Sequence, residues 1–502
     1  MKIAVVADLH LPDRTDTFKE KLLDAALAAM APAHVDLILG GGDMTGFGTP
    51  AAADRLAAKL RRTGIPFLLT PGNAEYRSGP EVSGQVAAIL RTESVHGRFV
   101  ILNSALNRLD DEARALLRGL PEHAVIVTHT PPSYWPEDDR ALLAEQDGRY
   151  DLIIAGHVHY DSVSGKVRTV RGMDPDKAIG GAPAVMILED AADGGFRFSE
   201  LAIPELDIAD ITRWNEADRR AFFAGIGISG MHEPLETLDF AARERIAAFE
   251  LRFTSLAEVG TDVLKPALAR WRGCGGRILS LHLPDLGWKD GALSGSEAVA
   301  DAIRSAADLG CDRLTLHVPK MSVNDAADPA VREAVLAETA RRISEANEAG
   351  LTVGIENMHM RKSEKPDGFR RYGYTCGECR DWIADLRARL ARPEMTGFHF
   401  DIGHARNNAP YSSIEPVGTW LADLGPEMNA MHLHQVEKQP GAYANHRPLT
   451  TLFGPLISLS SLFAAWKTGK VGRIPMFLEI RDSLGPESWR TLRRLILPEA
   501  AS

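Results

Sequence analysis

The sequence has 502 residues, of which 45% are hydrophobic and 25% are charged. These proportions are typical of a soluble globular protein with a large core, and they exclude a disordered chain, collagen and a coiled coil. Because a typical domain has about 150 residues and one barrel about 250, the length predicts two or three domains. The formal net charge of −11 disfavours phosphate backbones and anionic membranes as partners of the whole chain, while a local basic groove stays open.

The cysteines and the start of the chain bear on its compartment. Four cysteines are present: Cys274, Cys311, Cys376 and Cys379. They are too few for a disulfide framework, and the CxxC spacing of the last two has no second pair, so we expect a helix start there. Asp8 and His10 interrupt the apolar start too early for a signal peptide, and no apolar run approaches the roughly 20 residues that span a bilayer. The sequence therefore predicts a cytoplasmic protein without membrane contact.

Two series of strands and helices follow one another, and we expect them to form domains of residues 1–205 and 206–502. The first series predicts an α/β layered domain, with apolar runs at 2–7, 35–40, 66–70, 99–102, 124–128 and 151–156 and a helix at 18–30. A polar stretch at 203–220 separates the two series. The second series has apolar runs at 225–230, 247–253, 277–284, 312–320, 351–359, 396–405, 429–437 and 475–482, and its clearest helix spans 328–350. About eight βα units in just under 300 residues predict a (β/α)8 TIM barrel.

Metal-type side chains stand where the strands of the first domain end. They are Asp8, His10, Asp43, Asn73, His129, His157 and His159. A lone buried histidine is more often hydrogen-bonded core than a ligand, but this sheet edge is where α/β proteins bind ligands, and chance does not easily place so many there. Mixed carboxylates and imidazoles suit Mn, Fe, Ni or Zn. A carboxylate shared by two ions, best assigned to Asp43, would hold them about 4 Å apart.

Five motifs of this domain carry a family resemblance: Asp8-x-His10, Gly42-Asp43, Gly72-Asn73, His129 and Gly156-His157-x-His159. In order and approximate spacing they resemble the calcineurin-like metallophosphoesterase superfamily over residues 1 to about 203. The resemblance implies an α/β/β/α sandwich that hydrolyses phosphoesters with two divalent transition metals, Asp43 and His129 being catalytic. It also implies two ligand sets: Asp8, His10, Asp43 and His159 for one ion, and Asp43, Asn73, His129 and His157 for the other.

Position 74 departs from that family, whose members usually have a histidine there that protonates the leaving oxygen. Here Ala74 and Glu75 follow the asparagine, which brings the resemblance closer to the small bacterial phosphodiesterases of the superfamily. Three explanations stay open. The substrate has a good leaving group, or Glu75, His96 or a residue of the second domain supplies the proton, or the activity is reduced.

Polar side chains also stand at nearly every strand end of the second domain, where a barrel has its active site. They are His282, His317, Glu356, Asn357, Asp401, His404, His432, His434 and Glu479. Hydrogen bonds to loop backbone would explain single members of this set. They explain the whole set poorly.

This second series resembles the xylose-isomerase-like barrel superfamily over roughly residues 222–495. The superfamily includes sugar and sugar-phosphate isomerases and epimerases, and also AP endonucleases. The resemblance implies one metal set of Glu356, Asp401, His432 and Glu479, whose two glutamates are also catalytic because they shuttle a proton between sugar carbons. Further expected ligands, of the multi-metal endonuclease type, are His282, His317, His404 and His446. Ala444 replaces an aspartate of that type, and we expect one to three ions of Mn, Zn, Fe or Co.

Four cations near the two centres are candidate contacts of a substrate phosphate: Arg171, Lys177, Lys320 and Arg481. Arginine pairs with phosphate through two parallel hydrogen bonds, which favours this interpretation. A solvated loop or an exposed side chain explains each of them equally well.

Together the two halves predict a bifunctional metal-dependent enzyme with a small phosphorylated substrate. The first domain would hydrolyse a phosphodiester or phosphomonoester of a carbohydrate-like molecule, and the barrel would isomerise, epimerise or otherwise process the sugar. A DNA repair nuclease is the alternative, because both superfamilies contain DNA-cleaving members, but the acidic charge and the lack of a basic stripe with interleaved aromatics disfavour nucleic acid. A third hypothesis makes one domain a scaffold. The sequence is compatible with a homo-oligomer.

Overall fold

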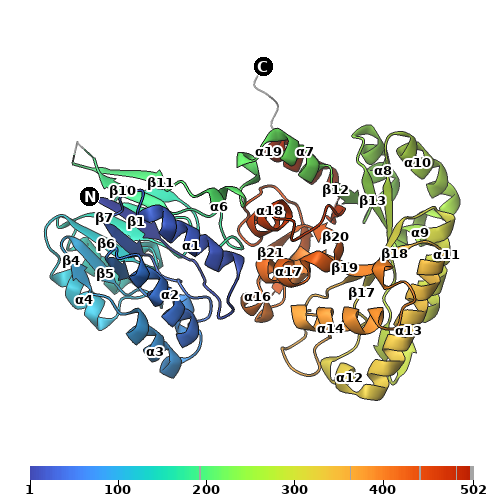
Figure 1. Cartoon of the computed structure of the whole chain (residues 1–502), viewed down its shortest axis with the longest axis horizontal. Coiled ribbons are helices and arrows are strands. Elements are labelled where there is room, and N and C mark those ends of the chain that lie inside the picture. The colour runs from blue at the N-terminus through green and yellow to red at the C-terminus, as the bar shows by residue number, and fades with distance from the viewer. Residues whose placement is uncertain (192–193, 362, 440–441, 482, 498–502) are drawn as a thin grey trace. The chain divides into compact units, whose positions relative to one another are not determined.

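The computed structural model describes residues 1–191, 194–361, 363–439, 442–481 and 483–497. The chain divides into two compact units (Figure 1), the first running from Met1 to Asp210 and the second starting at Ile211. The polar stretch at 203–220 is folded: it contains helix α6 (Pro204–Asp207), the 3-10 helix η3 (Ile211–Arg213) and the start of helix α7 (Glu216–Phe223). No helix in the described ranges combines the length and the apolar character that crossing a bilayer needs.

The first unit contains two β-sheets. Its strands are β1 (Lys2–Val6), β2 (Leu37–Gly40), β3 (Phe67–Leu69), β4 (Val95–His96), β5 (Phe99–Leu102), β6 (Ala124–Thr128), β7 (Tyr150–Ala155), β8 (Ser162–Ser164), β9 (Val167–Thr169), β10 (Met186–Asp190) and β11 (Phe196–Glu200). One sheet has the order β11-β10-β1-β2-β3 and the other the order β4-β5-β6-β7-β9-β8. Strands β1 to β3 are mutually parallel, and so are β5 to β7. Within each set the carboxyl ends therefore share one edge. The six apolar runs expected from the sequence are β1, β2, β3, β5, β6 and β7.

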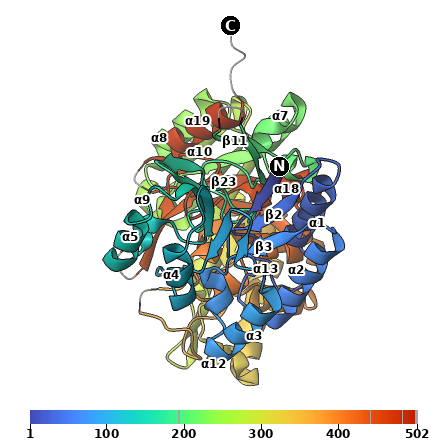
Figure 2. The ribbon, with the colours of Figure 1, turned by 90° about the vertical axis from the view of Figure 1, so that its left-hand side faces the viewer.

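Helices cover both outer faces of these sheets. They are α1 (Phe18–Met30), α2 (Pro50–Arg62), α3 (Pro80–Leu90), α4 (Asp111–Arg118) and α5 (Glu137–Ala144), with the 3-10 helices η1 (Asn73–Tyr76) and η2 (Pro132–Tyr134). Helix α1 has the bounds that the sequence predicted, and the side chain of Thr17 caps its start by accepting from the backbone N–H of Glu20. Figure 2 shows α1 and α2 on one side of the strands and α4 and α5 on the other.

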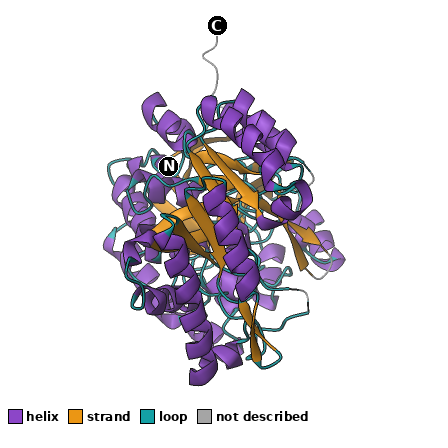
Figure 3. Ribbon diagram, turned by 90° about the vertical axis from the view of Figure 1, so that its right-hand side faces the viewer, coloured by secondary structure: helices purple, strands orange, loops and turns teal. Residues whose placement is uncertain are grey.

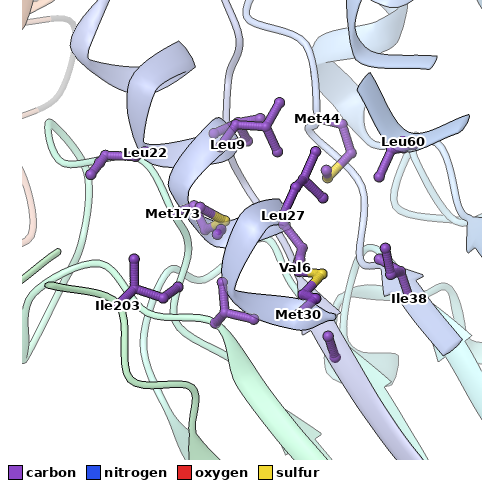
Figure 4. Close-up of a cluster of buried hydrophobic side chains, with 14 of the residues drawn as sticks. Val6, Leu9, Leu22, Leu27, Met30, Ile38, Met44, Leu60, Met173 and Ile203 are labelled. Carbon is purple, nitrogen blue, oxygen red and sulfur yellow. The ribbon is translucent and has the colours of Figure 1, made fainter. Parts of the chain in front are cut away.

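The alternation of side chains along β1 builds two layers of core. Ile3 and Val5 point between the two sheets, whereas Ala4 and Val6 point toward α1. Figure 4 shows the layer under α1, where Val6 packs with Leu27 and Met30 of the helix. A third cluster lies under α4 and α5. The unit is therefore an α/β/β/α sandwich, which confirms the expected class.

The second unit is a closed barrel of eight strands. In barrel order they are β12 (Ile226–Ser229), β13 (Ala248–Arg252), β14 (Ile278–His282), β17 (Arg313–His317), β18 (Thr352–Glu356), β19 (Thr396–Asp401), β20 (Met428–Leu433) and β23 (Met476–Leu478). Neighbouring strands are parallel, and each of the eight expected apolar runs matches one barrel strand, with β20 starting one residue before its run. Two hairpins extend from it: β15 (Gly287–Lys289) with β16 (Ala292–Ser294), and β21 (Gln435–Gln439) with β22 (Ala442–Arg447). The structure therefore confirms the TIM barrel.

In Figure 3 helices (purple) surround the barrel strands (orange). Besides α7 they are α8 (Pro234–Arg243), α9 (Phe253–Val259), α10 (Thr261–Gly273), α11 (Ser296–Asp308), α12 (Val323–Ala327), α13 (Pro329–Glu348), α14 (Cys376–Arg387), α15 (Ile402–Arg406), α16 (Tyr411–Ile414), α17 (Val417–Asp423), α18 (Ser460–Lys467) and α19 (Gly485–Ile496), with η4 (Pro393–Met395) and η5 (Gly425–Glu427). Helix α13 starts at the capping side chain of Asp328 and ends before Gly350, whose φ is +83°. The CxxC pair opens α14, as expected, and both cysteines are buried and form no disulfide with a described residue.

We predict that a fragment of residues 206–502 folds by itself and keeps bound transition metal. The reason is that β12 pairs with both β13 and β23, so the barrel closes on strands of its own. Circular dichroism with a cooperative thermal transition, and metal analysis after purification without chelators, check this. A fragment that shows no cooperative transition would contradict it.

Candidate metal centres

The expected ligands of the first unit lie on loops at the carboxyl ends of its strands. Asp8 and His10 follow β1, Asp43 follows β2, Asn73 follows β3, His129 follows β6, and His157 and His159 follow β7. Strands β1 to β3 belong to one sheet, whereas β6 and β7 belong to the other. The candidate centre therefore forms where the carboxyl edges of the two sheets meet.

Five of these seven residues hold a left-handed backbone that side chains other than glycine rarely adopt. They are Asp8 (φ +49°), His10 (+49°), Asp43 (+50°), His157 (+70°) and His159 (+60°). Such a conformation costs on the order of 1 to 3 kcal/mol per residue and persists only where the surroundings fix it. Here the loops fix one another, since the backbone N–H of His10 donates to the carbonyl of Asp43 at 2.9 Å. Strain at ligand positions is a common property of functional sites.

Glycines precede three of the ligands, Asp43, Asn73 and His157, because the loops approach one another closely. A Cβ on Gly42 would lie 2.5 Å from Nδ1 of His129, and a Cβ on Gly72 would lie 2.2 Å from the backbone nitrogen of Asp43. Any side chain at either position would push a ligand out of place. The Gly-Asp and Gly-Asn motifs are thus a packing requirement of the centre.

Half of the centre is formed by Asp43, Asn73, His129 and His157. Nε2 of His129 lies 3.1 Å from Oδ1 of Asn73, 3.2 Å from Nδ1 of His157 and 3.4 Å from Oδ1 of Asp43. Nδ1 of His129 donates to the carbonyl of Gly41 at 2.9 Å, which leaves the lone pair on Nε2. The opposite orientation of the Asn73 amide would let it donate to both rings. In either orientation the amide lies against two ring nitrogens, and the orientation with the oxygen inward is the one that a metal ligand would adopt.

The other half is formed by Asp8, His10 and His159 with the second oxygen of Asp43. Nε2 of His10 lies 3.6 Å from Oδ2 of Asp43, and Nε2 of His159 lies 3.8 Å from Oδ1 of Asp8. Asp43 thus turns one oxygen to each half, as a bridging ligand would. Burial, followed by repulsion from Asp43, raises the pKa of Asp8 well above its ordinary value. The ammonium of Lys177 lies 3.0 Å from Nε2 of His10.

Glu75, one of the expected proton donors, clamps the ligand loops together. Its carboxylate accepts from the backbone N–H of Asp43 (3.1 Å), Thr45 (2.8 Å) and Gly72 (2.7 Å), and from the Thr45 hydroxyl (2.7 Å). Burial, with Asp43 nearby, raises the pKa of Glu75 to about 7. Both oxygens of Glu75 are engaged by these loops, and the preceding Ala74 is fully buried.

Two other expected residues are not brought into the centre. His96 is exposed on β4 and its Nδ1 lies 2.6 Å from the carboxylate of Glu93. The Arg171 guanidinium binds the carboxylates of Asp161 and Glu200, and it also donates to a backbone carbonyl. Three of its five N–H donors are thus engaged by the protein, and a role of Arg171 as a phosphate contact stays a prediction.

The four expected principal ligands of the barrel converge. Nδ1 of His432 lies 3.3 Å from Oε1 of Glu356, 3.3 Å from Oε2 of Glu479 and 3.6 Å from Oδ2 of Asp401. Three carboxylates this close in a dry interior repel one another unless cations compensate them, so the donor set fits a divalent ion. Burial alone would raise the pKa of Glu356, but His317 and His432 outweigh burial and hold it well below its ordinary value.

Glu250, which sequence reasoning missed, orients His432. Its Oε1 lies 2.6 Å from Nε2 of His432, and its other oxygen accepts from the hydroxyls of Ser280 and Thr315 at 2.9 Å each. Burial alone would raise the pKa of Glu250, but His432 holds it at about 2. With Nε2–H bound to Glu250, the Nδ1 lone pair of His432 faces the three carboxylates. The available signal was a glutamate in the middle of the apolar run at 247–253.

His282 and His317 reach the second oxygen of Glu356. Their Nε2 atoms lie 3.1 Å and 3.5 Å from Oε2 of Glu356. Nδ1 of His282 donates to the carbonyl of Leu283 at 3.0 Å, and Nδ1 of His317 lies 2.7 Å from Oδ1 of Asp285, which the sequence interpretation did not include. Burial alone would lower the pKa of His317, but Glu356 and Asp285 raise it to about 10. A metal ion at Nε2 would take the place of that proton.

His404 and His446 border the same carboxylates. Nδ1 of His404 donates to the carbonyl of Asn357 at 3.0 Å. Its Nε2 is buried and has no hydrogen-bond partner within the described part of the chain. Nε2 of His446 lies 3.1 Å from Oε2 of Glu479. A buried lone pair without a donor is what a further metal ligand would show.

His434, which the sequence placed at a strand end without a ligand role, orients Asp401. Its Nε2 lies 3.0 Å from Oδ1 of Asp401, and its Nδ1 accepts from the backbone N–H of His446 at 3.0 Å. Asp401, His404, His434 and His446 form one group whose ligand atoms all lie within 4.8 Å of one another. Since both nitrogens of His434 are engaged, its role is to hold Asp401.

Three cationic side chains lie next to the candidate ligands of the barrel. Of the expected phosphate contacts, Lys320 is ion-paired with Asp285, and Nε of Arg481 donates to Nδ1 of His446 at 3.2 Å. Arg252, at the end of β13, was not expected and lies 2.8 Å from Oε1 of Glu479.

Comparisons with known proteins agree with this geometry. A family model described as calcineurin-like phosphoesterase matches residues 1–161, and one described as xylose isomerase-like TIM barrel matches residues 188–496. No curated protein matches the sequence.

Three solved structures illustrate the structural similarity. The TTHB071 protein from Thermus thermophilus is 22% identical, with 55% of this chain and 99% of that chain covered and a TM-score of 0.37. The 3-keto-D-glucoside 4-epimerase from E. coli is 14% identical, with 54% of this chain and 98% of that chain covered and a TM-score of 0.39. A putative xylose isomerase from Rhodospirillum rubrum is 16% identical, with 54% of this chain and 96% of that chain covered and a TM-score of 0.41. From its family matches, the chain belongs to the xylose isomerase-like TIM barrel family and carries a calcineurin-like phosphoesterase domain ahead of the barrel.

Proposed function

We propose that the chain is a bifunctional metal-dependent enzyme for small phosphorylated substrates. Its first domain hydrolyses a phosphodiester or phosphomonoester of a carbohydrate-type molecule, and its barrel isomerises, epimerises or further processes the sugar. One observation carries the proposal: in both domains, ligand histidines donate a hydrogen bond from one ring nitrogen to a carbonyl or carboxylate of the protein. Their free lone pairs therefore face buried carboxylates.

In the first domain Asn73, His129 and His157 would hold a divalent ion against Asp43. Carboxylate, amide and imidazole donors suit Mn, Fe, Ni or Zn. Such an ion acts as a Lewis acid toward a phosphoryl oxygen and acidifies water. The protein contributes position, because the strained turns and the Glu75 clamp fix the ligands in the free enzyme. Burial lowers the pKa of His157 to about 4, so its ring is neutral and free to bind metal at neutral pH.

We predict that Asp43→Asn reduces phosphoesterase activity at least about 100-fold while leaving the fold intact, because removing the charge of the ligand between the two halves weakens the whole centre. The substitution keeps the oxygen that accepts from the backbone N–H of Ala74. Turnover of bis(p-nitrophenyl) phosphate with Mn²⁺ measures the effect. Asp54→Asn, at an exposed position of α2, is the matched control. Retention of most of the activity in Asp43→Asn would disprove the assignment.

A second prediction concerns the leaving group. Ala74 offers no acid and the oxygens of Glu75 are engaged by the loops, so the rate should fall steeply as the leaving group becomes more basic. Aryl diesters should be cleaved much faster than alkyl diesters. The measurement is log kcat/KM against leaving-group pKa over a series of substituted phenyl esters. A slope near zero would show that another residue already donates the proton.

In the barrel, Glu356 and Glu479 flank Nδ1 of His432 from two sides. Isomerase chemistry uses carboxylates that move a proton between adjacent carbons while a metal ion polarises the carbonyl. His282 and His317 go beyond the four principal ligands and favour more than one ion. Their presence is what supports the second candidate, a nuclease. Salt-dependent binding of duplex DNA would favour that candidate, and the net charge of −11 opposes it.

We predict that Glu250→Gln weakens metal binding by the barrel about 10- to 100-fold, because His432 loses the carboxylate that fixes its ring. Competition with a chromophoric chelator measures the affinity. Ser280→Ala is the matched control, since its hydroxyl binds the other oxygen of Glu250 and it does not contact His432 in the described structure. Equal affinities for wild type and Glu250→Gln would contradict the orienting role.

A further inference from the structure

The ammonium of Lys177 reaches into the half of the first centre that Asp8, His10 and His159 form. Its Nζ lies 3.0 Å from Nε2 of His10, the atom that would bind an ion. Burial lowers the pKa of Lys177 to about 8, while Asp174 and Asp43 oppose that shift. The ammonium in turn acts to lower the pKa values of Asp8, His10 and His159. The lysine therefore contacts one of the four side chains that the family resemblance assigns to one metal ion, and its charge interacts with the other three.

The loop that carries this lysine is fastened to the ligand loops. The backbone N–H of Asp174 donates to the carbonyl of Asp8 at 3.0 Å, and that of Ile179 donates to the carbonyl of His159 at 3.1 Å. Lys19 and Asp174, both buried, form an ion pair of 2.7 Å. A Cβ on Gly172 would lie 2.8 Å from Cβ of Asp8, so the two backbones touch. Lys177 is thus presented by a fixed part of the site.

The two halves of the centre also differ in how they are built. Nδ1 of His129 is held by a carbonyl, whereas the buried Nδ1 atoms of His10 and His159 have no hydrogen-bond partner in the ranges that the structure describes. Metal–ligand bonds of about 2.0 to 2.2 Å place tetrahedral ligands roughly 3.3 to 3.6 Å apart. The separations around His129 (3.1 to 3.4 Å) and those of the other half (3.6 and 3.8 Å) scatter on both sides of this range, and Asp8, His10 and His159 form a group that could hold an ion. The two halves therefore differ in the contacts of their Nδ1 atoms and in the presence of Lys177, and their distances fit an ion equally well.

We propose that the ammonium of Lys177 takes the place of one metal ion, so that the first domain is a one-ion centre completed by a lysine. The ion is bound by Asp43, Asn73, His129 and His157, and Lys177 supplies the positive charge of the other half. This inference rests on the proposed metal-dependent function of the first domain. It changes the expected metal content from two ions to one in this domain.

The test counts Mn²⁺ bound per full-length chain by equilibrium dialysis with elemental analysis. Ions in the barrel are common to all variants and cancel in the differences. We expect His157→Ala to lower the count by one and His10→Ala to leave it unchanged. Lys177→Met should raise the count by one, and His10→Ala in the Lys177→Met background should abolish the gain. Lys166→Met, at a partly exposed lysine of the same domain that is paired with Asp147, is the charge-matched control and should change nothing.

The opposite pattern would overturn the proposal: His10→Ala lowers the count of the wild type by one, and Lys177→Met adds no ion. If Lys177→Met does not fold, Lys177→Gln and the comparison of His10→Ala with His157→Ala in the wild-type background decide the question. Ion counts do not depend on turnover. A chain that binds one ion in this domain but hydrolyses no phosphoester would therefore reject the proposed function and keep this inference.

Discussion

Both candidate centres depend on five histidines whose orientation is fixed by a hydrogen bond from the ring nitrogen that faces away from the centre. For His129, His282 and His404 the acceptor is a backbone carbonyl, and for His317 and His432 it is a carboxylate. An imidazole that donates through one nitrogen has only the other lone pair to offer, so the protein sets the direction of each ligand before an ion arrives. Four of the five acceptors lie in or directly after strands, and the fifth, Asp285, lies in the loop that follows β14. The rigidity of the sheets is thereby transferred to the ligands.

Most of the architecture could be predicted because apolar periodicity and strand ends are local signals. The eight apolar runs of the second half match the eight barrel strands, and residues at the carboxyl ends of these strands, such as His282 and Glu356, lie close together. The same reasoning placed Asp8, Asp43 and His129 together in the first domain. A polar residue after a buried parallel strand needs no knowledge of tertiary contacts to be recognised.

Partners that depend on contacts distant in the sequence could not be predicted. Glu250 is 182 positions away from His432, and the position of Glu250 inside an apolar strand gives no indication of which side chain it meets. Arg171 and Lys177 looked alike in the sequence as cations on one loop. In the structure the guanidinium of Arg171 is ion-paired with Asp161 and Glu200, whereas the ammonium of Lys177 contacts His10. Only the packed loop distinguishes a structural cation from one inside the centre.

The left-handed backbone at the ligands of the first domain lowers the stability of the fold at the positions that the candidate metal centre needs. Glycine would adopt the same conformation at His157 and His159 without steric cost and would relieve about 1 kcal/mol or more at each. Substitutions that stabilise this domain and silence it are thus one step away at several positions.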